Sequence, residues 1–187
     1  MTDSPRFQGF ETARLRIAPT RECDIPALIP IQEACHRYFA FDPGPEEPAE
    51  ETIRGEMSGR WLPPGGVPER NFHLTLWQNA RPVGFAVVYL GFPHDICAYI
   101  GLLFLDEAAR GGGLGRELVE GLTEALEPMG ISELRIGVSL RNWPGLRFWT
   151  GLGFNTVTKV SAPGHYRPEA RALIELSAPI NTLTRKD

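Results

Sequence analysis

The sequence predicts an α/β fold in which helices cover both faces of a β-sheet. Residues 98–105 are apolar on both parities, as in a strand that is covered on both faces. Leucines recur at every fourth position over 114–126, which predicts one buried helix face. A second strand is predicted at 133–140. Because a helix separates the two strands, they are expected to be parallel neighbours.

The elements before this unit follow from local signals. Residues 1–11 are expected to form an arm without regular structure. The alternation over 13–18 predicts a strand, which the proline after it ends. Asp24 is expected to cap a helix that begins near Ile25, and Pro30 is expected to kink or shorten that helix.

The middle of the chain reads as a loop, a helix and a hairpin. Residues 41–50 are rich in proline and acidic residues and predict a loop. A helix is predicted at 50–60, ended by the Pro-Pro-Gly-Gly sequence that follows it. Strands are predicted at 72–77 and 83–90, and the short turn between them makes them antiparallel.

The end of the chain is expected to add one short helix and two strands. The helix is predicted at 144–150, with a proline in its first turn and a glycine C-cap after it. The strands are predicted at about 155–160 and 172–176, joined by the loop at 161–166.

Length and composition restrict the class of protein. The chain has 187 residues, 42% of them hydrophobic and 22% charged, which is ordinary for one globular domain spanning 1–187. The net charge of −4 argues against a nucleic-acid partner. Cys23, Cys35 and Cys97 show neither disulfide nor metal-ligand spacing. No signal peptide or membrane span is recognisable, so we expect a cytoplasmic protein with reduced cysteines.

A glycine-rich segment joins the 98–105 strand to the helix after it. Residues 110–116 read Arg-Gly-Gly-Gly-Leu-Gly-Arg. Glycines at a helix start let backbone N–H groups turn outward and let an anion approach closely. The helix dipole and the charges of Arg110 and Arg116 add positive potential. The segment therefore predicts a phosphate or pyrophosphate site.

Two common phosphate-binding patterns fit this segment badly. A nucleoside-triphosphate loop requires Lys and then Ser or Thr after its last glycine, and here Arg116 and Glu117 follow. A dinucleotide fingerprint requires G-x-G-x-x-G, and counted from Gly113 the sixth position is Leu118. A nucleotide-binding protein is therefore the disfavoured interpretation.

A third pattern fits better. On Arg110, Gly113 and Gly115 the segment follows Arg-x-x-Gly-x-Gly. This resembles the pyrophosphate loop of the GNAT superfamily of acyl-CoA-dependent N-acyltransferases.

A second segment strengthens the resemblance. Residues 142–154 resemble the family's Asn-x-x-Ala-x-x-Phe-Tyr-x-x-x-Gly-Phe segment, with Gly145 in place of the alanine and Trp149 in place of the tyrosine. The two segments stand in the family's order, one helix and one strand apart. The resemblance covers about residues 12–178.

The resemblance implies a mixed, mostly antiparallel twisted sheet of six or seven strands. The sheet would splay into a V between 98–105 and 133–140, with helices on both faces. Acetyl-CoA would lie in the V as co-substrate, and no metal is implied. Its pantetheine would pair with the strand backbone, and its pyrophosphate would meet the N–H groups of the glycine segment. The implied cofactor-binding residues are Leu103, Phe104, Leu105, Arg110, Gly111, Gly112, Gly113, Leu114, Gly115, Arg116, Asn142 and Phe148.

The implied reaction is direct attack of a neutral amine on the thioester. The N–H of Leu103 would stabilise the oxyanion. Trp149 cannot replace the tyrosine that often protonates the departing thiolate, because an indole has no acidic proton to give; Tyr166 is the candidate substitute. Tyr99 occupies a position where many relatives carry a glutamate base, and with its high pKa it is expected to hold a water. Ordinary core packing is the alternative for Tyr99.

The acceptor would lie against the first two helices and the last hairpin. Tyr38, Phe39 and Glu46 are the candidate acceptor-binding residues, and acidic and aromatic side chains suit a cationic amine. A solvated run of charges is the alternative for the acidic residues. The favoured interpretation is an N-acetyltransferase for a small-molecule or peptide amine. The alternative is a catalytically weak acyl-CoA-binding or sensing module. By analogy, exposed edges of such sheets allow a homodimer.

Overall fold

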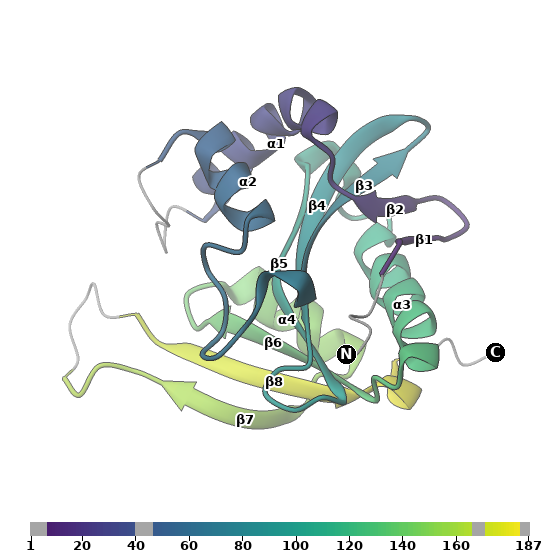
Figure 1. Ribbon diagram of the computed structural model, residues 1–187. Helices are drawn as coiled ribbons and strands as arrows, with labels where there is room; N and C mark the ends of the chain where they lie inside the picture. Colours follow the sequence, from purple (N-terminus) through teal and green to yellow (C-terminus); the bar gives the residue numbers. More distant parts are fainter. Residues whose placement is uncertain (1–6, 40–46, 166–170, 184–187) are drawn as a thin grey trace.

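One sheet runs through the whole molecule. The computed structural model describes residues 7–39, 47–165 and 171–183 (Figure 1). Within these residues the sheet has eight strands in the order β1-β2-β3-β4-β5-β6-β8-β7, so the predicted six or seven is slightly low. The strands are β1 (Phe10–Glu11), β2 (Arg16–Pro19), β3 (Asn71–Gln78), β4 (Arg81–Leu90), β5 (Cys97–Leu105), β6 (Glu133–Ser139), β7 (Thr156–Ser161) and β8 (Leu173–Pro179).

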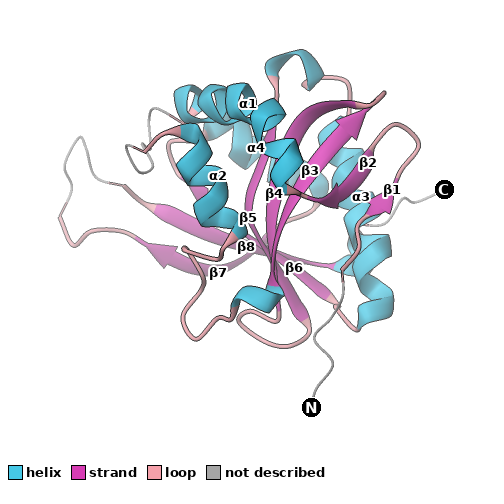
Figure 2. Ribbon diagram, turned by 45° about the horizontal axis from the view of Figure 1, so that its top comes forward, coloured by secondary structure: helices cyan, strands magenta, loops and turns pink. Residues whose placement is uncertain are grey.

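Helices cover both faces of this sheet, as predicted. The helices are α1 (Ile25–Tyr38), α2 (Ala49–Met57), α3 (Leu114–Leu126) and α4 (Trp143–Leu152). Figure 2 shows α1 and α2 together on one side of the central strands and α3 on the other. Each side has its own apolar core: α3 and α4 pack into the larger one, and α1 and α2 into the smaller. No helix in the described ranges is long and apolar enough to cross a membrane.

The N-terminal segment differs from the prediction. Phe10 and Glu11 form the edge strand β1, where an unstructured arm was expected, and they pair with Ile17 and Arg16. The predicted strand at 13–18 begins only at Arg16 and continues into Pro19. Residues 12–15 are instead the turn between the two strands. A strand of two residues is too short to show an alternating pattern, so β1 was not predicted.

The start and interior of α1 also differ from the prediction. Asp24 stands at the N-cap position but makes no side-chain capping bond. Its carboxylate instead accepts from the backbone N–H of Arg21 at 2.9 Å and from the Arg21 guanidinium at 3.1 Å. Pro30 does not shorten the helix, which continues to Tyr38. The inward face of α1, with Leu28, Ile31 and Cys35, is buried in the smaller core. This packing stabilises the helix by more than the loss of the one backbone hydrogen bond that a proline removes.

β5 and β6 are the only parallel pair of the described sheet, and they separate along their length. Their pairing runs from Cys97↔Glu133 to Ile100↔Ile136 and stops there. Beyond that point β6 stays paired with β8 through Ser139, and β5 stays paired with β4 through Leu105. The sheet is therefore split between the two strands, as the predicted V requires.

A bulge at Gly101 determines which side chains of β5 face each core. The register with β4 shifts there, because Ile100 pairs with Val88 while Leu102 pairs with Val87. Ile100, before the bulge, is buried in the larger core, whereas Phe104, after it, is buried in the smaller one. Both faces of β5 are thus covered, in agreement with its apolar composition.

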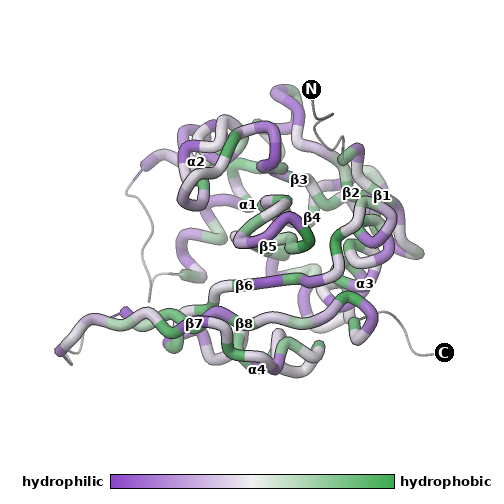
Figure 3. The backbone as a smooth tube through the Cα atoms, turned by 60° about the horizontal axis from the view of Figure 1, so that its bottom comes forward, coloured by the Kyte–Doolittle hydropathy of each residue, from purple (hydrophilic) through white to green (hydrophobic). Residues whose placement is uncertain are grey.

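The last two strands form the far edge of the sheet. β7 and β8 are antiparallel neighbours, and β8 joins them to β6. In Figure 3 this hairpin runs alongside β6 and extends beyond the rest of the fold, with α4 beneath it. The hairpin leaves Val157 and Val160 of β7 largely exposed.

Candidate functional site

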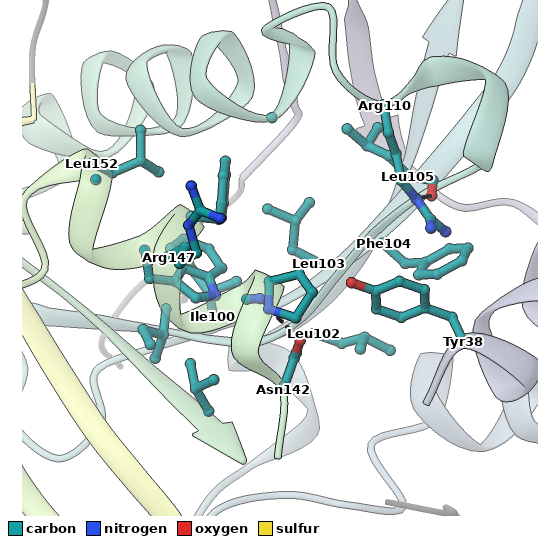
Figure 4. A pocket seen from close by; sticks show the side chains of 18 of the residues that line it. Tyr38, Ile100, Leu102, Leu103, Phe104, Leu105, Arg110, Asn142, Arg147 and Leu152 are labelled. Carbon is teal, nitrogen blue, oxygen red and sulfur yellow. Dashed lines mark hydrogen bonds between the residues drawn. The ribbon is translucent and has the colours of Figure 1, made fainter. Parts of the chain in front are cut away.

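A cavity of about 770 Å³ occupies the split between β5 and β6. Six parts of the described chain line it: the diverging ends of β5 and β6, the glycine segment with the start of α3, the helix α4, the end of α1, and Leu173 of β8. Figure 4 shows Tyr38 of α1 and Arg147 of α4 on opposite sides of this space, with the β5 residues between them. Of the predicted site residues, Tyr38, Phe39, Leu103, Phe104, Leu105, Arg110, Gly111, Gly113, Leu114, Gly115, Arg116, Asn142 and Phe148 line it.

The edge of β5 that faces the cavity carries unpaired backbone groups. The carbonyl of Phe104 lies against Gly84 of β4, and the N–H of Asp106 donates to Val83 of β4 at 2.8 Å. Since backbone groups alternate in direction along a strand, those of Leu103 and Leu105 point the other way, into the split. The Leu105 carbonyl accepts from Arg110, and an extended polar chain in the cavity could pair with the remaining groups as an additional strand would.

The glycine segment presents backbone amides at one end of this edge. Gly111 and Gly113 have φ of +78° and +83°, the left-handed region that glycine adopts freely. A Cβ placed on Gly111 or Gly112 would meet nothing within 4 Å, so the surface above them is open. Gly113 is the N-cap of α3 and no side chain caps that helix, which leaves its first N–H groups available. An anionic diphosphate fits this cradle.

Arg14 contacts the glycine segment and is itself held by Glu117. Neither residue was predicted from the sequence to be part of the site. The Arg14 guanidinium donates to the carbonyl of Gly112 at 2.8 Å and to the Glu117 carboxylate at 2.6 Å. Thr12 donates its hydroxyl to the same carboxylate at 2.6 Å. No pattern marks Arg14, because its partners are about a hundred positions away in the chain.

The two arginines predicted to supply charge to the glycine segment diverge. Arg116 donates to the carbonyl of Gly151 at the end of α4, at 3.0 Å. The Nε of Arg110 donates to the carbonyl of Leu105 at 2.7 Å. The guanidinium of Arg110 then lies over the rings of Tyr38 and Phe104, on the α1 side of β5. The structure therefore does not bring the Arg110 charge to the glycine amides.

The second motif meets the first at α3. The side chain of Asn142 caps α4 by accepting from the N–H of Gly145 at 2.9 Å. A Cβ on Gly145 would lie 2.5 Å from the Asn142 amide nitrogen, so an alanine here would require the Asn142 side chain to shift. The Phe148 ring reaches α3, where a Cβ on Gly115 would lie 3.0 Å from it. The two motifs are thus packed against each other at Gly115 and Phe148.

Tyr99 is not among the residues that line the cavity. Its hydroxyl lies next to Gly137 of β6, 2.7 Å from where a Cβ on that glycine would be. Burial, together with the charge of Glu175 and against that of Arg135, raises the pKa of Tyr99 to about 12. A phenol with this pKa is neutral at physiological pH, so Tyr99 acts only as a neutral hydrogen-bonding group.

Trp149 lines the cavity but is packed as a core residue. It is buried, and its ring makes edge contacts with Phe148 and Phe154. Two further predicted site residues, Glu46 and Tyr166, lie outside the described residues. The described ranges contain no group of three or more His, Cys, Asp or Glu side chains that could hold a metal ion.

The chain matches a known family over most of its length. The sequence model of the acetyltransferase (GNAT) family matches residues 28–154. The matched range includes α1 from Leu28 onward, both diverging strands, the glycine segment and α4. Every element that borders the cavity, apart from the β8 residue Leu173, therefore falls inside it.

Individual relatives have acetyltransferase names. A mycothiol acetyltransferase of Catenulispora acidiphila is 32% identical over 125 residues, which are 63% of this chain but only 37% of that protein. A ribosomal protein bS18-alanine N-acetyltransferase of Escherichia coli K12 is 27% identical over 76% of this chain and 82% of its own. The crystal structure of a putative acetyltransferase, yncA, from Salmonella typhimurium with acetyl-CoA has a TM-score of 0.62 at 18% identity, covering 89% of this chain and 94% of its own.

Proposed function

We infer that this chain, which belongs to the acetyltransferase (GNAT) family, is an N-acetyltransferase that moves the acetyl group of acetyl-CoA to a primary amine of a small molecule or peptide. The whole chain is proposed to be one acetyltransferase domain. One relative is named for mycothiol and another for an alanine of a ribosomal protein. These names support an amine acceptor without choosing between a small molecule and a peptide.

One structural observation carries this proposal. The unpaired edge of β5 and the amides of the glycine segment border the same cavity. Leu103 offers its N–H and carbonyl, and Leu105 its N–H, to an extended amide-containing chain. Gly111 to Leu114 offer N–H groups to a diphosphate. Coenzyme A joins these two chemical features in one molecule. The cavity thus fits a CoA thioester better than a nucleotide, which has no extended amide arm.

The N–H of Leu103 is proposed to stabilise the oxyanion. The thioester supplies an activated acyl carbon, to which a neutral amine forms a C–N bond as the C–S bond breaks. A backbone N–H held by a β-strand needs little reorganisation when negative charge develops on the carbonyl oxygen. The proton of the attacking amine passes to solvent, with the Tyr99 hydroxyl as the proposed holder of a water on that route.

The departing thiolate is proposed to leave without a side-chain acid at position 149. The indole of Trp149 cannot protonate sulfur, and its burial against Phe154 indicates a packing role. A thiol with a pKa near ~8.5 is a moderately good leaving group. No cysteine is proposed as a nucleophile, because none of the three lines the cavity. Burial also raises the pKa of the Cys35 and Cys97 thiols.

A second reading is a catalytically weak acyl-CoA-binding module. It is favoured by the same Trp149 and by the position of Tyr99 outside the cavity lining. Both readings require acetyl-CoA to bind, and they differ only in turnover.

Thermal unfolding with added ligands tests the binding step. Acetyl-CoA is expected to raise the melting temperature, with about 2.7 kcal/mol of stabilisation at a hundredfold excess over Kd. ATP and NAD are expected to have little effect, and stabilisation by ATP alone would overturn the proposal. Release of free thiol across a panel of amines then separates an enzyme from a binding module.

Two substitutions at one position test whether the diphosphate lies against the glycine segment at 111–114. Gly112→Asp and Gly112→Asn add side chains of nearly equal size where no atom lies within 4 Å. Both are expected to fold, but the aspartate repels a diphosphate and should weaken acetyl-CoA binding at least tenfold relative to the asparagine. Equal affinities of the two variants would place the diphosphate elsewhere.

A further inference from the structure

The Arg110 guanidinium is directed to the acceptor end of the cavity. Its Nε is fixed on the carbonyl of Leu105 at 2.7 Å, the last carbonyl of β5 on the side of the split. Its Cζ lies 4.4 Å from the ring centre of Tyr38 and 4.7 Å from that of Phe104. Figure 4 shows it beside these two rings and away from Arg147, the cation on the α4 side. The two arginines therefore serve different parts of the cavity.

No carboxylate neutralises Arg110 among the residues that the structure describes. Within the described residues its side chain makes one hydrogen bond, to a backbone carbonyl. The acidic side chains of the neighbouring segments have other partners. Glu47 pairs with Arg60 at 2.6 Å, and Glu50 pairs with Arg54 at 2.9 Å. Of the described residues, these two glutamates are thus engaged with other arginines, and the charge that Arg110 presents to this end of the cavity is not paired with a described carboxylate.

The contacts of Arg110 leave its terminal nitrogens available. The Nε–H is used on Leu105, and the ring faces of Tyr38 and Phe104 hold the plane of the group. The two NH₂ groups remain as donors in a fixed fork, the arrangement that binds a carboxylate through two parallel hydrogen bonds. A group held in place before binding loses less entropy when the ligand arrives.

We propose that Arg110 selects an acceptor amine that also carries a carboxylate, with an apolar group beside it that packs on Tyr38, Phe39 and Phe104. This rests on the acetyltransferase function proposed above and names its substrate class. A diamine or other polycation would bring a like charge to Arg110 and is disfavoured at this site. A free amino acid with an apolar side chain has the required groups.

Matched acceptors test the carboxylate directly. Phenylalanine, its amide and 2-phenylethylamine differ only in the carboxylate, and leucine, its amide and isoamylamine form an aliphatic set. Thiol release is expected to give a kcat/KM roughly 10- to 100-fold higher for the two acids than for the counterparts that lack the carboxylate. Arg110→Gln is expected to abolish this ratio, and Arg110→Lys to restore part of it. Arg147→Gln is the matched control and should leave the ratio unchanged.

A binding measurement makes the result independent of turnover. Calorimetry of the CoA-loaded protein with N-acetylphenylalanine and its amide is expected to show the same preference for the acid, lost in Arg110→Gln. Equal binding of acid and amide by the unaltered protein would overturn the proposal. So would an Arg110→Gln variant that keeps the preference and instead loses affinity for acetyl-CoA, because Arg110 would then belong to the co-substrate.

Failure of the function proposed above has a different signature. If acetyl-CoA does not bind, the acetyltransferase proposal fails together with this inference. If acetyl-CoA binds and amines are acetylated at equal rates with and without a carboxylate, only the inference fails.

Discussion

Arg14, in the turn between β1 and β2, forms an ion pair with Glu117 in the first turn of α3. The Arg14 Nε lies 2.6 Å from Oε2 of Glu117, and the backbone N–H of Arg14 donates to Oε1 at 2.7 Å. The same guanidinium holds the carbonyl of Gly112. Because this carbonyl is fixed on the inner side, the peptide N–H that follows it is turned outward. A residue outside the family's glycine motif thus orients the amides of the proposed phosphate cradle.

Removing the Arg14 side chain should weaken acetyl-CoA binding. Arg14→Gln deletes the charge and the hydrogen bond to Gly112. Part of the binding free energy is then used to order the glycine segment when acetyl-CoA binds. We expect a three- to tenfold rise in Kd by calorimetry, from a contact of about 1 kcal/mol. Arg16→Gln is the control, since Arg16 lies over Trp77 and away from the cradle. Lower stability with unchanged affinity would show that Arg14 only supports the fold.

Glu117 should make stability depend on acid pH. Burial alone would raise its pKa, but hydrogen bonds from Thr12 and Arg14 outweigh it and hold the pKa below 4.5. A carboxylate with a lowered pKa in the folded state adds stability above its unfolded pKa, and this is lost as pH falls through the folded value. The difference in unfolding free energy between the unaltered protein and Glu117→Gln should therefore be constant from neutral pH to about 5.5 and shrink below 4.5. A difference that stays constant down to pH 3 would contradict this.

Adjacent glycines of the cradle should respond differently to alanine. Gly113→Ala forces a Cβ into the left-handed region at φ +83°, which costs about 1–2 kcal/mol. Gly112 has no positive φ and open space around it, so Gly112→Ala should be neutral or slightly stabilising. Urea unfolding without ligand measures both. Equal stabilities would mean that the loop relaxes when Gly113 is replaced.

The central part of the fold follows from sequence because its signals are local. The four-residue repeat over Leu114–Leu126 gives α3, and the helix between β5 and β6 makes these strands parallel. The split between the two strands was predicted from the resemblance to a family, because the hydrophobic periodicity of the strands gives no sign of it. Most of the lining residues follow from these two facts.

The contacts that complete the site could not be read from the sequence. The Arg14–Glu117 pair and the Arg110 position depend on segments that meet only in the folded chain. Asp24 satisfies the usual pattern of an N-cap, yet it bonds to Arg21, because a guanidinium beside it competes with the backbone. Charges found close in sequence, such as Glu47 and Glu50, do not line the cavity, since each pairs with an arginine. Local signals carry no information on such pairings.

The last prediction concerns Gly137 and Tyr99, which share one space on β6 and β5. A Cβ on Gly137 would lie 2.7 Å from the Tyr99 hydroxyl and 3.2 Å from Leu173. Gly137→Ala should therefore overpack this site and cost about 1–3 kcal/mol of unfolding free energy. Tyr99→Phe removes only the hydroxyl and keeps the ring, so it should cost less. The hydroxyl is the atom that would clash with a Cβ at position 137.

The double variant decides whether the two residues are coupled. In Tyr99→Phe/Gly137→Ala the missing oxygen leaves room for the new methyl group, so most of the loss should be recovered, with a coupling of about 1 kcal/mol or more in a double-mutant cycle. Urea unfolding of the four proteins measures this. Additive effects would mean that Leu173, rather than Tyr99, limits the space at Gly137. Recovery would show that glycine at 137 is required by the Tyr99 side chain, which the strand pattern of β6 alone does not reveal.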